Sequence, residues 1–271
     1  MKTFSRLSFI HGLVALVFLG LIAQVRAEDP AQGYTSGFSA VRKASNDLYK
    51  SLDEKNREHL HPQPISLETP DAPQVYPIEN KDENPPLRMV AISAGCIDLL
   101  NRVAHAKAID KIEPGYFDKY VLSLAKEGDD AALQELPNSA NPKFWTEDVM
   151  NDQISNFNQM VGMMVALNLS HHYLKHYDKY AAKLTDAAGQ PVSINNFLTE
   201  DEWDKSVRAA AVNSLNCAMA TAGIQSFFEA IDKMPKRPKW TLYFLPAKVD
   251  VKRLKNQLAK YEVDFFHGKL K

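Results

Sequence analysis

The sequence lacks the features that mark several large classes of protein. It has only two cysteines, so it has no disulfide framework, and the most it allows is one bond between Cys96 and Cys217. Both lie in apolar helical surroundings, so the sequence leaves open whether they form that bond or stay as buried thiols. It also lacks internal repeats, low-complexity tracts and an excess of charge of one sign. The balanced charge argues against a nucleic-acid partner.

Common catalytic motifs are missing as well. There is no G-x-S-x-G elbow and no glycine-rich phosphate loop, and the "SAGC" around Cys96 has no assignable partner histidine. His105 lies beside the apolar stripe of its helix, where we expect a hydrogen-bonded structural residue. These absences leave few routes to a conventional hydrolase.

The N-terminus has the layout of an export signal. Lys2 and Arg6 precede the apolar run "LVALVFLGLIA", and "VRA" follows just before Glu28. The run is shorter than the ~20 residues of a membrane span, so we predict a signal peptide over residues 1–27, with an uncleaved anchor as the alternative. Cleavage removes three of the 32 basic residues and none of the 33 acidic ones, which leaves a net charge of −4. We expect a periplasmic or secreted protein without a transmembrane domain.

The rest of the chain predicts a mainly α fold with a small β element, that is, an α+β protein. Residues 28–60 have the composition of an N-terminal helical segment, and the prolines of 61–86 predict an extended linker, because proline excludes helix and central strand alike. Residues 87–271 then form a mostly helical domain that begins with a strand, "LRMVAIS". Apolar periodicity and capping signals predict helices over 36–59, 96–110, 116–125, 147–185, 201–234 and 251–261, with Gly223 as a possible break in the helix over 201–234.

Three histidines lie close together on the longest predicted helix. His171 falls on the apolar stripe and is expected to face the core, while His172 and His176 lie one turn apart on an adjoining stripe. Two imidazoles at this spacing can reach one zinc ion. In an H-E-x-x-H motif, however, a glutamate follows the first histidine, and here Tyr173 stands there; with a free pKa of about 10, it is a poor base at neutral pH.

A second alignment of the motif gives a resemblance to a known family. In the HtpX-like and Ste-type zinc metallopeptidases, a further histidine commonly lies five positions after the second histidine of H-E-x-x-H, and His171 and His176 have that separation. Upstream, "MVAISAGCIDLL" resembles the strand and turn that precede the family's zinc helix. Downstream, "LNCAMATAGIQSFFEAIDKM" resembles the segment after its third ligand. The order of the three segments implies a zincin-like metallopeptidase scaffold.

The resemblance also implies that most of the zinc site has been lost. The motif positions would be occupied by Leu167 as first ligand, Asn168 as general base and His171 as second ligand. The third ligand would fall near Arg208 and Val212, which cannot bind zinc. A substitute carboxylate could come from Glu200, Asp201, Glu202 or Asp204, with Glu202 the candidate we name, or these residues could form a charged first helical turn.

These observations predict an exported, non-hydrolytic protein that binds or scaffolds a peptide or protein partner, with either no cofactor or Zn²⁺. The alternative is a divergent, active zinc metallopeptidase that uses His172 and His176, or His171 and His176. A further possibility is that the histidines are structural, with His171 in the core and the other two partly exposed. A structural module unrelated to peptidases would be favoured if Leu87–Ser93 were not a strand bordering the histidine helix.

Overall fold

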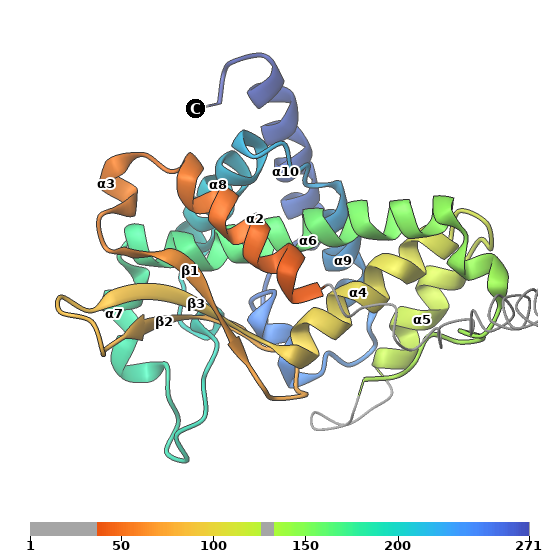
Figure 1. Cartoon of the computed structure of the whole chain (residues 1–271), viewed down its shortest axis with the longest axis horizontal. Helices are drawn as coiled ribbons and strands as arrows, with labels where there is room; N and C mark the ends of the chain where they lie inside the picture. Colours follow the sequence, from red (N-terminus) through yellow and green to blue (C-terminus); the bar gives the residue numbers. More distant parts are fainter. Residues whose placement is uncertain (1–36, 126–132, 271) are drawn as a thin grey trace, which may run out of the picture. The chain divides into compact units, whose positions relative to one another are not determined.

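Helices dominate the computed structural model, which describes residues 37–125 and 133–270 (Figure 1). This confirms the expected mainly helical fold with a small β element, whereas the predicted signal peptide lies outside the described residues. The elements are α2 (Gly37–Ser51), α3 (Glu54–Arg57), β1 (Leu60–Glu68), β2 (Val75–Asn80), β3 (Leu87–Ser93), α4 (Ala94–Ile109), α5 (Tyr116–Leu124), α6 (Glu147–Tyr173), α7 (His176–Tyr180), α8 (Glu200–Asn216), α9 (Ala222–Lys233) and α10 (Val251–Phe266), with short 3₁₀ turns between some of them.

The three strands form one mixed sheet in the order β1-β3-β2. The central strand β3 is the predicted "LRMVAIS" strand; β1 pairs with it in parallel and β2 antiparallel. The prediction of a linker over 61–86 needs correction, because β1 and β2 both come from this segment. Its prolines are compatible with this, since both are edge strands, and the ladder of β1 is irregular between Leu60 and Ile65, where Pro62 and Pro64 lie. The segment therefore belongs to the fold.

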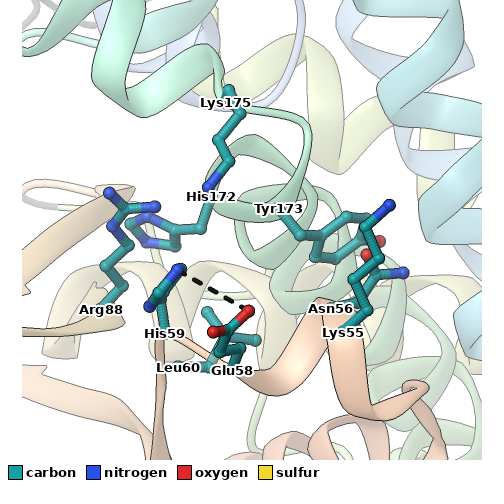
Figure 2. Close-up of a pocket in the computed structure, with 9 residues that line it drawn as sticks. All are labelled: Lys55, Asn56, Glu58, His59, Leu60, Arg88, His172, Tyr173 and Lys175. Atoms are coloured by element: carbon teal, nitrogen blue, oxygen red, sulfur yellow. Dashed lines mark ion pairs between the residues drawn. The ribbon is translucent and has the colours of Figure 1, made fainter.

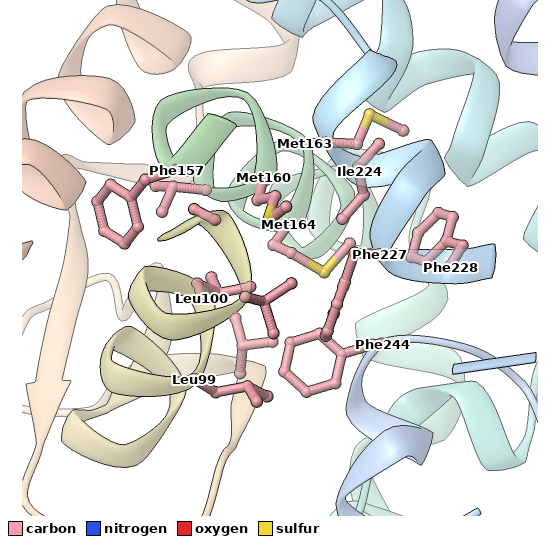
Figure 3. Packing of buried hydrophobic residues seen from close by; sticks show 14 of the residues in the cluster. Leu99, Leu100, Phe157, Met160, Met163, Met164, Ile224, Phe227, Phe228 and Phe244 are labelled. Carbon is pink, nitrogen blue, oxygen red and sulfur yellow. The ribbon is translucent and has the colours of Figure 1, made fainter. Parts of the chain in front are cut away.

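Helix α6 forms the centre of the described chain. It packs against α2, α4, α8 and α9, and every residue from Met160 to His172 is buried. A helix that is buried on all sides contacts neighbours all round instead of along one stripe. Figure 3 shows its methionines among side chains of α4 and α9, together with Phe244. This packing fixes the position of the histidines at the end of α6.

Two of the predicted long helices are interrupted. The helix expected over 147–185 ends at Tyr173, and Lys175 adopts a left-handed backbone conformation, φ 65°, before α7 begins. The helix expected over 201–234 is divided into α8 and α9. The capping box of Thr199 and Glu202 at the start of α8 is confirmed. Only the first interruption changes the candidate site.

The cysteines and the helix lengths answer two further questions. Cys96 is buried in α4, Cys217 is half-buried at the end of α8, and both are free thiols. Burial raises the pKa of Cys96, so its thiol stays protonated and unreactive. Within residues 37–125 and 133–270, no helix combines the length and the apolar character that crossing a membrane requires.

Candidate functional site

The turn at Lys175 brings together two histidines that a continuous helix would separate. At 100° per residue, His171 and His176 would point about 140° apart on one α-helix. The left-handed turn between α6 and α7 instead places their Nδ1 atoms 3.3 Å from each other. The pairing predicted from the five-residue separation is therefore present, and it depends on the backbone conformation of one residue.

Ser206 of α8 completes what we call the inner histidine cluster: His171, His176 and Ser206. Its Oγ lies 3.3 Å from Nδ1 of His171 and 3.1 Å from Nδ1 of His176, and all three side chains are buried. The hydroxyl also lies 2.9 Å from the carbonyl oxygen of Glu202, one turn earlier on α8. If it donates its single proton there, its lone pairs accept from whichever imidazole carries its proton on Nδ1, and that N–H also points toward the unprotonated Nδ1 of the other imidazole. The cluster can thus satisfy its own hydrogen bonds without a ligand.

Burial keeps both imidazoles of the cluster neutral. The pKa of His171 is held well below its usual range, first by burial and then by the neighbouring His176 and His172. Burial also lowers the pKa of His176, although Glu202 acts in the opposite direction. A neutral imidazole has a free lone pair on one nitrogen, which is the form that hydrogen-bonds to its neighbours or binds a metal.

His172 points to a different neighbour from the inner cluster. Its Nε2 donates to the carbonyl oxygen of Met89 in β3 at 2.8 Å, and its ring lies 4.9 Å from that of Tyr177. Burial lowers the pKa of His172 to about 3, which overrides the effect of the hydrogen bond. Because Nε2 carries the proton, Nδ1 keeps its lone pair, and it has no hydrogen-bond partner among the described residues.

The contacts of His172 change two expectations. If His172 and His176 are structural, the sequence predicts that they are partly exposed, but both are buried. His172 lies on the part of α6 that is covered on all sides, and His176 at the start of α7 faces Ser206 of α8. They also contact different elements: His172 bonds to β3, whereas His176 faces α8. The hydrogen bond to Met89 places Leu87–Ser93 as a strand bordering the histidine helix, so the condition that would have favoured an unrelated module is not met.

The position expected for the general base is closed. Asn168 is buried and its Nδ2 donates to the carbonyl oxygen of Met164 in the same helix, at 2.9 Å. Leu167, at the position of the first ligand, is also buried. Arg208 faces solvent and Val212 is half-buried on α8. None of these side chains provides a group that could activate water.

Of the four carboxylates near the start of α8, Glu200, Asp201 and Glu202 lie in the first turn and Asp204 lies just after it. Glu202 accepts hydrogen bonds from Lys179 at 2.6 Å and Tyr180 at 2.9 Å as well as from Thr199. Burial would raise its pKa, but these hydrogen bonds outweigh burial and lower the pKa of Glu202 to about 2. The other three make the ion pairs Asp201–Lys205, Asp204–Arg253 and Glu200–Arg253.

A hydrolytic zinc site does not fit the side chains gathered here. No three His, Cys, Asp or Glu side chains of residues 37–125 and 133–270 are placed to hold one metal ion. The separations of 3.1–3.3 Å within the inner cluster do resemble the spacing of about 3.3–3.4 Å between ligands in a tetrahedral zinc site. Its third corner, however, is the hydroxyl of Ser206, which lies outside the usual donor set.

A pocket opens beside His172, and none of the three inner-cluster residues lines it (Figure 2). Its cavity volume is about 90 Å³ and it is open to solvent. In Figure 2, Arg88, His59 and His172 lie at one end, and Lys55 and Asn56 lie by Tyr173 at the other. We call it the basic pocket. Its lining residues are Lys55, Asn56, Glu58, His59, Leu60, Arg88, His172, Tyr173 and Lys175.

Sequence reasoning missed Ser206 and the basic pocket. Ser206 lies four residues after the candidate ligand Glu202 on α8, so the two side chains share one helix face. That spacing is the signal in the sequence that could have pointed to Ser206. The pocket draws on α3, β1, β3 and the end of α6, which no local pattern connects. Comparison of the chain with protein-family models, with curated proteins and with solved structures gives no match.

Proposed function

We propose that this protein is an exported, non-hydrolytic binding protein on a zincin-like scaffold, which holds a peptide or protein partner. The observation that carries the proposal is the closed inner cluster, in which His171 and His176 bond to each other and to Ser206. The strand β3 beside the histidine helix supports the scaffold assignment, since the resemblance implies that arrangement.

The lost groups are those that hydrolysis needs. A catalytic zinc site uses about three protein ligands, an open position for water and a general base. Here leucine and asparagine occupy the positions of the first ligand and the base, and both are buried against neighbouring side chains. Binding of a peptide or protein requires neither the zinc ligands nor the general base. A scaffold without these groups can therefore bind a partner but cannot hydrolyse it by the zinc mechanism.

The second candidate is a divergent zinc metallopeptidase centred on His171 and His176. The tetrahedral spacing of the inner cluster favours it, with Ser206 standing in for the missing third ligand. The version that uses His172 and His176 has less support, because His172 contacts β3 whereas His176 faces Ser206 of α8.

Metal content separates the two candidates. The mature protein, purified without a histidine tag, would be loaded with zinc, dialysed and examined by elemental analysis, and its cleavage of casein would be followed in parallel. We expect no stoichiometric zinc and no cleavage, because the cluster lacks a carboxylate ligand and a base.

His171→Ala and His172→Ala make a matched pair for this experiment, since both remove a buried histidine from the end of α6. If wild type and His172→Ala retain one zinc per chain while His171→Ala loses it, and casein is cleaved, the metallopeptidase candidate replaces our proposal. Zinc lost only in His172→Ala would instead assign a metal to the unpartnered Nδ1 of His172.

A further inference from the structure

We propose that the basic pocket binds a carboxylate group, carried by a small ligand or by the C-terminus of a peptide. The proposal rests on the proposed binding function and names the chemical class of the ligand. It makes no use of the inner cluster, since His171, His176 and Ser206 do not line the pocket.

The charges around the pocket favour a monoanion. Lys55, Arg88 and Lys175 line it together with one carboxylate, Glu58. Arg88 also makes an ion pair with Asp178 at 2.5 Å. With Asp178 included, the net charge is +1, which one carboxylate would neutralise. A phosphate dianion would leave an uncompensated negative charge beside Glu58 and Asp178.

The three cations differ in how they are held. Arg88 is mostly buried and fixed by Asp178, so its remaining N–H groups are pre-positioned donors. Lys55 and Lys175 are exposed, and neither makes an ion pair with any of the described residues. One fixed cation and two exposed lysines without ion pairs form an arrangement that can bind an anion.

The backbone of Lys175 indicates that its side chain has a use. Its φ of 65° lies in the left-handed region, which disfavours any residue with a Cβ and favours glycine. A lysine nevertheless occupies this turn, and Figure 2 shows its side chain running toward His172 at the pocket. Backbone strain retained at a pocket wall is typical of residues kept for binding.

The uncharged part of the wall suggests the rest of the ligand. Leu60 and Tyr173 provide apolar and aromatic surface, and His172 contributes a buried Nδ1 acceptor without a partner among the described residues. Such an acceptor favours a ligand that carries an N–H group near its carboxylate. N-acyl amino acids and peptide C-termini have both groups adjacent.

The test uses two probes that differ in charge, N-acetylglycine and N-acetylglycinamide. Saturation-transfer NMR would measure their binding to the mature protein at fixed ionic strength. We expect N-acetylglycine to bind at least about tenfold more tightly than the amide, since only the acid carries the charge that the three cations recognise.

Lys175→Gly separates a binding role from a structural one. It removes the cation and relieves the strained backbone, so we expect affinity for N-acetylglycine to fall about three- to tenfold while Tm rises by about 2 °C. Ala218→Gly is the matched control: Ala218 also has positive φ, 58°, but it does not line the pocket. It should raise Tm and leave affinity unchanged.

Three results would overturn the proposal. Equal affinity for the two probes would show that the pocket does not recognise the negative charge. Unchanged affinity in Lys175→Gly would show that Lys175 forms the turn but does not bind the ligand. Displacement of N-acetylglycine by lower concentrations of inorganic phosphate would assign the pocket to phosphate. If neither small probe binds, a tripeptide acid and its amide replace them, and the same criterion applies. None of these results bears on zinc content or casein cleavage, so failure of this proposal can be told apart from failure of the proposed function.

Discussion

Replacing Gly95 by alanine is expected to destabilise the protein by about 3 kcal/mol or more, at the upper end of the usual cost of overpacking. Gly95 lies in the first turn of α4, directly after β3. A Cβ there would lie 1.7 Å from the carbonyl oxygen of Asp71 and 2.3 Å from its carbonyl carbon. Both are backbone atoms, so no side chain can move aside to make room.

The loop that would have to move is held in place by Ser93. Its Oγ donates to the carbonyl oxygen of Ala72 and accepts from the backbone N–H groups of Gln74 and Cys96. The backbone N–H of Gly95 also donates to the carbonyl oxygen of Pro70. Displacing this loop would break several hydrogen bonds together, at least two of them part-buried, which explains why the expected loss is large.

Urea unfolding of Gly95→Ala and Gly115→Ala would check this prediction. Gly115 has φ 86°, but a Cβ at this position would have nothing within 4 Å of it, so alanine there costs only its backbone strain, about 1 kcal/mol. Equal destabilisation by the two variants would contradict the clash at Gly95 and leave backbone conformation as the common cause.

Much of the fold follows from patterns that are local in the sequence. The β3 strand, the helix after it and the capping box of α8 are all predictable, because each depends on residues within a few positions of one another. The orientation of His171 toward the core also follows from helical periodicity. Such signals are strong where one short segment determines its own conformation.

The edge strands and the turn at Lys175 cannot be predicted in this way. Residues 60–80 form strands because β3 supplies hydrogen-bond partners from farther along the chain, and that pairing overrides the high proline content. The α6–α7 turn has a lysine where glycine would have signalled a helix end. Tertiary contacts determine both features.

The candidate site is predictable only in part for the same reason. The five-residue separation of His171 and His176 is visible in the sequence, but their contact depends on the turn at Lys175, and Ser206 reaches them from another helix. The basic pocket is assembled from segments more than a hundred residues apart. The sequence supplies a set of candidate residues, whereas the division between an inner cluster and an outer pocket requires the structure.

The buried histidines are expected to make the protein strongly sensitive to mild acid. His171 and His172 are neutral in the folded protein, with the pKa of His172 lowered to about 3 and that of His171 well below its usual range. In the unfolded chain a histidine binds a proton near pH 6.5. Between pH 6.5 and 5 the unfolded state therefore takes up protons that the folded state does not. The free energy of unfolding decreases as the pH is lowered through this interval.

The expected loss over this interval is about 2 kcal/mol for each of the two histidines, or about 4 kcal/mol together. The stabilisation is fully present above pH 6.5 and decreases as the pH falls toward the folded-state pKa values. The lowered pKa values of His105 and His176 act in the same direction. Glu202 does not contribute in this window, because a carboxylate whose pKa is lowered to about 2 loses its stabilising effect only below about pH 4.5.

His172→Gln tests which side chains take up the protons. The glutamine amide can donate to the carbonyl oxygen of Met89 as the imidazole does, but it does not titrate. Urea unfolding at about pH 7.5, 6.5 and 5 should show that the variant loses about 2 kcal/mol less than wild type over the acid interval. The same slope in both proteins would mean that His172 takes up its proton in the folded state. An anion or a water molecule at its Nδ1 would then have to stabilise the charged ring, and among the described residues the basic pocket is the cavity that adjoins it.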